Sequence, residues 1–156
     1  MVKPIILNYI EYPISRQGSK GEPASNKPML EMPITEKRKI ACLIDSGADR
    51  SISFKNIGEV WFGLKFNKED EIDKKISGFH SCPDEGCEKH PVKAPQYLKP
   101  ISFKMGGKNI LLNVIWIDRG QNLDEDVLFV LGRDFFDYFD VLFKQREEQV
   151  WLYPRK

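Results

Sequence analysis

The sequence predicts an all-β fold with one or two short helices. Two apolar runs, at residues 40–44 and 127–131, carry no charge and are typical of strands buried on both faces. Gly106 and Gly107 lie between two further β-rich runs, which is a signal for a hairpin. The 156 residues suffice for one globular domain with a real core.

The charge balance excludes some classes of partner. Lys and Arg number 24 against 23 acidic residues, a net charge of +1, so no excess positive field indicates nucleic acid or an anionic membrane. The longest apolar stretch, 110–117, is interrupted by Asn113 and is too short to span a bilayer. Without an export segment we expect a cytoplasmic protein, in which the three cysteines are thiols or metal ligands more often than disulfides.

The first third of the chain reads as a strand, a connection and a hairpin. Residues 4–14 are rich in Ile and Tyr, whereas 15–27 contain the Gly, Pro, Ser and Lys typical of a mobile connection. We therefore expect residues 1–27 to be an N-terminal strand with a flexible connection, and 28–156 to be the domain itself. The runs 29–34 and 38–44 are expected to pair as a hairpin that leads to Asp45.

The remaining elements are mostly hairpins. Residues 51–54 predict a strand, and 56–62 a short helix or turn before a charged segment. The runs 97–105 and 109–117 flank the two glycines, and the last two runs, 141–143 and 149–153, predict a closing hairpin.

An aromatic cluster near the C-terminus could suggest base stacking, but without a basic surplus we favour packing in the core and at a dimer interface. Its members are Phe135, Phe136, Tyr138, Phe139, Trp151 and Tyr153.

The first buried strand ends at Asp45, an unusual place for an acid. A carboxylate there loses hydration, so it persists only if local donors hold its charge or if it keeps a proton. Ser46 supplies a hydroxyl, and Gly47, which has no Cβ, lets another backbone or a ligand approach closely. The alternative is a carboxylate that caps a turn and has no chemistry.

Asp45-Ser46-Gly47-Ala48-Asp49 resembles the catalytic signature of the retropepsins, the retroviral-type (clan AA) aspartic proteases, in their cellular or prokaryotic form. The second buried strand strengthens this resemblance, because it ends in Gly132-Arg133-Asp134 as the supporting strand of that family does. The resemblance covers roughly residues 29–153. It implies a closed acid-protease barrel with a flap hairpin and one or two short helices.

The resemblance also assigns roles around the first motif. Gly132 and Arg133 would support the catalytic loop, with Arg133 forming a bidentate ion pair with Asp49. The alternative is that both are exposed charges at strand ends. Asp134 lacks a loop of small residues and is a poor candidate for a second catalytic acid.

Peptide hydrolysis by carboxylates needs two of them, since one group takes a proton from water and another gives one to the leaving nitrogen. The chain has one such motif, so we expect a homodimer in which each subunit contributes Asp45. In the family, the residue that matches Ser46 forms a hydrogen bond across the two-fold axis to the loop of the other subunit. Gly47 would let the substrate backbone approach. Ala48 and Asp49 would border the substrate cleft. The family's termini interleave between subunits, so residues 150–153 are expected to bury against a partner.

A protease of this family also needs a lid over the catalytic pair. We place this flap at Ser77, Gly78 and Phe79, between the two motifs. The alternative for Gly78 is an ordinary glycine in a loop.

One segment concentrates soft ligands for a metal. His80, Cys82, Cys87 and His90 lie within eleven residues and could bind a structural zinc ion that stiffens the lid. Their spacing matches no common zinc motif, and an exposed thiol loop or a reversible disulfide is the alternative. Cys42, within a buried strand, is expected to be a core thiol. No cofactor is required for the expected catalysis.

These features predict an aspartic endopeptidase that acts as a homodimer on a peptide or protein substrate. Arg50 departs from the retroviral pattern, in which an acid is frequent, so subsite preference stays open. The rival prediction is a non-catalytic peptide-binding or assembly module that has the same fold and a Cys/His zinc-binding loop.

Overall fold

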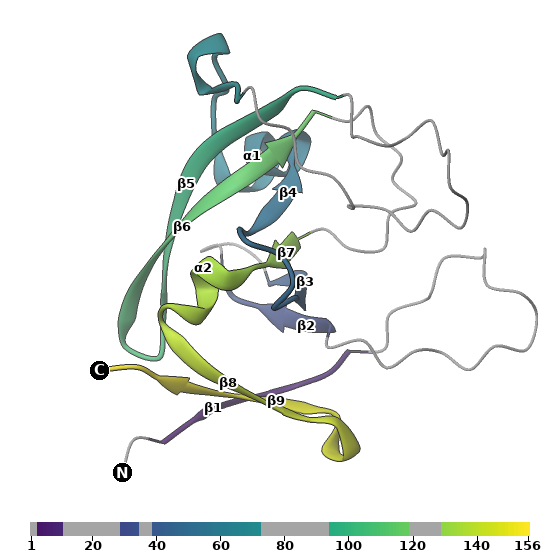
Figure 1. Ribbon diagram of the computed structural model, residues 1–156, viewed down its shortest axis with the longest axis vertical. Helices are drawn as coiled ribbons and strands as arrows, with labels where there is room; N and C mark the ends of the chain where they lie inside the picture. Colours follow the sequence, from purple (N-terminus) through teal and green to yellow (C-terminus); the bar gives the residue numbers. More distant parts are fainter. Residues whose placement is uncertain (1–2, 11–28, 35–38, 73–93, 119–128) are drawn as a thin grey trace, which may run out of the picture.

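The computed structural model describes residues 3–10, 29–34, 39–72, 94–118 and 129–156, whose strands form two sheets (Figure 1). The larger sheet has the order β2-β3-β7-β4-β6-β5, and the smaller has the order β1-β9-β8. The strands are β1 (Ile5–Asn8), β2 (Met29–Met32), β3 (Ile40–Ile44), β4 (Ile52–Phe54), β5 (Gln96–Met105), β6 (Lys108–Ile117), β7 (Phe129–Leu131), β8 (Phe139–Lys144) and β9 (Gln149–Pro154). The helices are α1 (Lys55–Phe62) and α2 (Arg133–Phe136), with 3₁₀ turns η1 (Lys68–Asp70) and η2 (Gln145–Glu147).

The all-β class with two short helices is confirmed, but the closure is not. Among the described residues neither sheet closes on itself, so two open sheets replace the expected closed barrel. The larger sheet ends at β2 and β5, and the smaller ends at β1 and β8. No helix in the described ranges has the length and apolar character needed to cross a membrane.

The three predicted hairpins are present. β2 pairs antiparallel with β3, and β8 pairs antiparallel with β9. β5 and β6 pair along their whole length around Gly106 and Gly107, whose φ angles are +58° and +77°. Two successive positive φ angles are what a tight two-residue hairpin turn requires, and glycine adopts them without steric cost.

The centre of the larger sheet brings the two sequence motifs together. β3 runs parallel to β7, with Cys42 opposite Phe129 and Ile44 opposite Leu131. All three residues of β7 are buried, while β3 alternates between buried and partly buried side chains. Because the two strands are parallel neighbours in register, Asp45 and Gly132 lie side by side, each just after the carboxyl end of its strand.

The core beside these strands is aromatic. The fully buried Trp116 of β6 makes edge-to-face contacts with Phe62, Phe66 and Phe129, with ring centroids 5.7 to 6.0 Å apart. Its indole N–H donates to the Lys99 carbonyl at 3.1 Å, so the ring is buried without an unmade hydrogen bond. α1, which contributes Phe62, ends at Gly63 in the left-handed conformation.

The smaller sheet joins the two ends of the chain. β9 lies in its centre, between β1 and β8 of the same chain (Figure 1), so both backbone edges of β9 are already paired. The N-terminal strand thus pairs with the C-terminal strand of the same chain, and the burial of residues 150–153 against a partner stays a prediction. Of the aromatic cluster, Phe135 and Phe139 are fully buried in the core, with centroids 5.1 Å apart.

Cys42 lies in the core, as the sequence predicts for a thiol within a buried strand. Its side chain is fully buried, and its thiol donates to the Ile40 carbonyl at 3.3 Å. Burial raises the pKa of the Cys42 thiol well above its ordinary value. The thiol is therefore inert at neutral pH and acts as a small apolar side chain.

Candidate active site

Asp45 is held directly at the end of β3. Its backbone N–H donates to the Leu131 carbonyl at 3.0 Å, which extends the pairing of β3 and β7 by one residue. The Gly47 N–H donates to Asp45 Oδ1 at 2.8 Å, and the Ala48 N–H donates to the Asp45 carbonyl at 3.3 Å. Asp45 is partly buried, Ser46 and Gly47 are exposed, and the hydrogen bond between Gly47 and the Asp45 carboxyl group is itself exposed. A backbone donor thus positions a carboxyl group that remains open to solvent.

Gly132 allows the loop after β3 to pass very close to the end of β7. A Cβ at this position would lie 2.4 Å from the carbonyl carbon and oxygen of Arg50 and 2.8 Å from the Ala48 carbonyl oxygen. These are backbone atoms, so they cannot move aside as a flexible side chain could. The Arg133 N–H donates to the Ala48 carbonyl at 2.8 Å and fixes this crossing.

Gly47 is also closely approached, but by a side chain. A Cβ there would lie 3.1 Å from Asp45 Oδ1, the oxygen that accepts the Gly47 N–H. A side chain at this position would therefore press on the carboxyl group. The glycine keeps the hydrogen bond and the space beside Asp45 at once.

Asp49 and Arg133 form the expected ion pair, but in a weaker geometry than expected. Arg133 Nη1 lies 3.4 Å from Asp49 Oδ1, a single contact where a bidentate pair was predicted. The two side chains are 68% and 91% exposed, so water screens their attraction. The backbone bond from Arg133 to Ala48 holds the loop more firmly than this ion pair.

A second carboxyl group, that of Asp134, anchors the far end of the loop. Its Oδ1 accepts hydrogen bonds from the Ser51 N–H at 2.9 Å, the Ser51 hydroxyl at 2.8 Å and the Phe135 N–H at 3.1 Å. The Ser51 hydroxyl in turn accepts from the Gly132 N–H at 3.1 Å. This network ties the loop after β3 to the start of α2.

The environment of Asp134 is unusual for a carboxyl group. Its Oδ2 is buried and has no hydrogen-bond partner among the described residues. Burial raises the pKa of Asp134, while the hydrogen bonds from Ser51 and Phe135 act in the opposite direction. From the sequence, Asp134 is only a poor candidate for a second catalytic acid, and its structural role was missed. Ser51 follows the first motif and is fully buried, and no local sequence pattern pairs it with Asp134.

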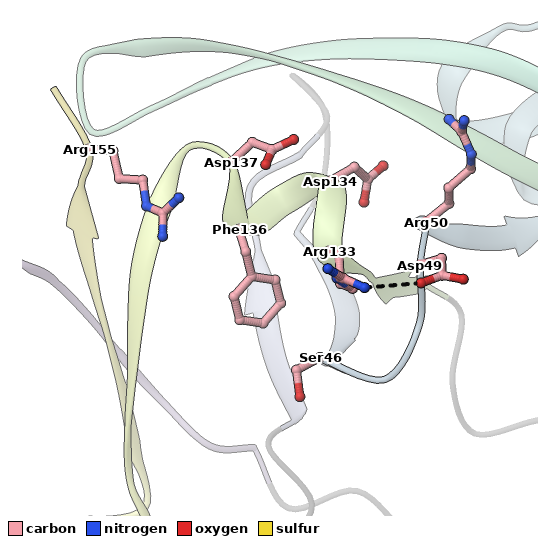
Figure 2. Close-up of a pocket in the computed structure, with 8 residues that line it drawn as sticks. All are labelled: Ser46, Asp49, Arg50, Arg133, Asp134, Phe136, Asp137 and Arg155. Carbon is pink, nitrogen blue, oxygen red and sulfur yellow. Dashed lines mark hydrogen bonds and ion pairs between the residues drawn. The ribbon is translucent and has the colours of Figure 1, made fainter.

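An open pocket of about 670 Å³ lies beside the loop (Figure 2). Ser46, Asp49 and Arg50 line it from the loop, and Arg133 and Phe136 line it from α2. The other lining residues are Asp134, Asp137 and Arg155. Asp45 is not among these residues, so the pocket flanks the carboxyl group and does not contain it.

Comparison with known proteins identifies the fold. The sequence matches no protein-family profile and no curated protein. A solved structure, that of a retropepsin-like aspartic protease from Rickettsia conorii, is similar over 97% of this chain and 91% of that chain, with a TM-score of 0.51 and 16% identity. The chain has a retropepsin-like fold.

Two sets of residues predicted from the sequence lie outside the described part of the chain. They are the flap residues Ser77, Gly78 and Phe79, and the candidate zinc ligands His80, Cys82, Cys87 and His90. The structure brings together the residues of both motifs, with Ser46, Gly47, Ala48 and Asp49 on the loop and Gly132 and Arg133 against it. Arg50, which departs from the retroviral pattern, is exposed beside the same pocket.

Proposed function

We propose that this protein is an aspartic endopeptidase that acts as a homodimer, with one Asp45 from each subunit. The observation that carries the proposal is the loop of Asp45. Its carboxyl group is fixed by the Gly47 N–H at the end of a central strand, yet it remains open to solvent. The retropepsin-like fold supports this proposal by analogy, and the loop of Asp45 carries it because a fold alone does not specify a reaction.

In the proposed reaction the two Asp45 carboxyl groups share one proton, because two carboxylates at close range cannot both be ionised. The ionised group takes a proton from water, which attacks the peptide carbonyl. The protonated group gives its proton to the leaving nitrogen as the peptide C–N bond breaks.

The surroundings of Asp45 have supporting roles in this proposal. Gly47 leaves room for the extended substrate backbone, and Ser46 bonds to the partner's loop. The loop stays in register with β7 because its backbone passes close to Gly132 and because the Arg133 N–H donates to the Ala48 carbonyl. The flap at Ser77, Gly78 and Phe79 would exclude water from the pair.

Peptide cleavage by the purified protein tests this proposal. Asp45→Asn keeps the size of the side chain but removes the acid, and it is expected to abolish the cleavage of a denatured protein substrate at acidic pH. Glu59→Gln, which also removes an exposed carboxyl group but on α1, is expected to cleave at the wild-type rate. Wild-type cleavage by Asp45→Asn would contradict the proposal. Binding of pepstatin without any cleavage would favour a module that binds peptides and does not cut them.

A further inference from the structure

Tyr138 lies where three parts of the fold meet. It belongs to the short turn between α2 and β8, which runs beside β6 (Figure 1). Its backbone N–H donates to the Phe135 carbonyl of α2 at 3.1 Å, and its backbone carbonyl accepts from the Arg155 N–H, just after β9, at 2.9 Å. Its phenol reaches β6 in the larger sheet. One residue therefore joins α2, the smaller sheet and the larger sheet.

The phenol takes the place of a neighbouring strand. Its O–H donates to the Leu111 carbonyl at 3.0 Å and accepts from the Leu111 N–H at 3.1 Å. β4 pairs with β6 only at residues 115–117, so among the described residues no strand lies on this side of β6 at Leu111. A hydroxyl group is both a donor and an acceptor, so it can satisfy both backbone groups of one residue.

α2 is too short to hold its own position. It has four residues, Arg133–Phe136, and no side chain caps its N-terminal end. A single helical turn is marginal by itself, so its place depends on contacts with the rest of the fold. At its start, Asp134 accepts hydrogen bonds from Ser51, which ends the loop of Asp45. Just after its end, Tyr138 bonds the larger sheet.

We infer that Tyr138 is a positioning residue for the loop of Asp45. It acts through α2, and not by contact with the reacting groups. Three residues lie between Asp134 and Tyr138, and the bond from the Tyr138 N–H to Phe135 closes the turn between them, so a shift of Tyr138 displaces Asp134. The inference rests on the proposed function, because the position of this loop matters for catalysis only if Asp45 reacts.

Amide hydrogen exchange, followed by NMR, tests the path from Leu111 to the loop. In the wild-type protein the Leu111 amide is expected to exchange slowly although no strand covers it, and fast exchange would overturn the inference. Tyr138→Phe keeps the ring and removes only the hydroxyl. We expect it to accelerate the exchange of Leu111, and of the Ser51 amide that bonds Asp134, at least about tenfold.

A neighbouring amide supplies the internal reference for this experiment. Directions alternate along a strand, so the Leu112 N–H points to β5 and is expected to keep its wild-type exchange rate in Tyr138→Phe. Unchanged exchange of Ser51 would overturn the inference, because the bond between Tyr138 and Leu111 would then have only a local effect. Equal acceleration of Leu112 would also overturn it, since the variant would then loosen the whole hairpin.

The kinetics of peptide cleavage give a second readout. A displaced Asp45 affects the reacting geometry more than the binding of substrate. We therefore expect kcat of Tyr138→Phe to fall at least about tenfold while KM stays within about twofold of wild type. Tyr97→Phe removes a hydroxyl from a partly buried tyrosine of β5 and is the matched control, with wild-type kcat and KM expected. Circular dichroism checks that both variants are folded at the assay temperature.

The two readouts separate this inference from the proposed function. If the wild-type protein cleaves nothing, the proposed function fails, and the exchange of Ser51 still decides whether Tyr138 positions the loop. If the wild-type protein cleaves peptides and folded Tyr138→Phe has the same kcat, the inference fails and the proposed protease remains.

Discussion

Asp134 accepts hydrogen bonds from both the backbone N–H and the hydroxyl of Ser51, at 2.9 and 2.8 Å, on a single carboxyl oxygen. Ser51 ends the loop that begins at Asp45, and Asp134 begins α2. The loop is therefore fixed at one end by the Leu131 carbonyl and at the other by this carboxyl group. The position of Asp45 depends on both anchors.

Removing the Ser51 hydroxyl is expected to destabilise the fold. Ser51→Ala removes the hydroxyl that donates to Asp134 and accepts from the Gly132 N–H. Ser51 is fully buried, so water does not replace these bonds. The expected loss is about 1–3 kcal/mol of unfolding free energy, measured by urea denaturation. Ser102→Ala, at an exposed serine of β5, is the control and is expected to change stability by less than about 0.5 kcal/mol. Equal effects of the two substitutions would contradict the role of Ser51.

The raised pKa of Asp134 predicts a pH dependence of stability. Because burial raises the pKa in the folded state, the folded protein binds this proton more tightly than the unfolded chain. The resulting stability is fully present below the unfolded pKa of about 4 and is lost as pH rises through the folded value. Asp134→Asn cannot ionise, so its unfolding free energy relative to wild type is expected to increase as pH rises above about 4. A difference that stays constant or shrinks with pH would show that Asp134 ionises without cost.

Gly132→Ala is expected to distort the crossing of the loop and β7. The new methyl group would lie 2.4 Å from backbone atoms of Arg50, so the loop that carries Asp45 must shift. We expect a loss of about 2 kcal/mol or more in unfolding free energy and a loss of peptide cleavage. Val60→Ala, which removes atoms from a side chain 78% exposed, is expected to leave both unchanged. Wild-type stability of Gly132→Ala would mean that the loop is not confined as described.

The Asp49–Arg133 ion pair is expected to contribute little to stability. Its single 3.4 Å contact and the exposure of both side chains predict a coupling energy below about 1 kcal/mol. A double-mutant cycle with Asp49→Ala and Arg133→Ala measures this coupling by urea denaturation. A coupling energy well above about 1 kcal/mol that does not change with salt would contradict this expectation. It would support the bidentate pair that the sequence predicts.

Sequence patterns predicted which strands pair, but they predicted the geometry of the side chains less well. The two apolar runs before Asp45 and Gly132, and the paired glycines at positions 106 and 107, specify local features that a few residues determine. The fold class and the hairpins were therefore accessible from the sequence. Periodicity predicts which residues form strands, but not whether a sheet closes.

The remainder of the site depends on contacts between distant residues. Ser51 and Asp134 are 83 positions apart, and no local pattern indicates that they meet. The single contact between Asp49 and Arg133 depends on where two exposed side chains extend, which the motif does not fix. The central place of β9 results from pairing with β1, at the opposite end of the chain. The flap and the candidate zinc ligands at positions 77–90 remain predictions.

The central claim is that two copies of Asp45 build one catalytic centre. Wild-type protein mixed with Asp45→Asn, at fixed total concentration and after subunit exchange, tests it most directly through the rate of peptide cleavage. If both acids are needed, the rate falls with the square of the wild-type fraction, to about a quarter in an equal mixture. A rate that falls in simple proportion, to about half, would show that each chain cleaves alone and would contradict the account.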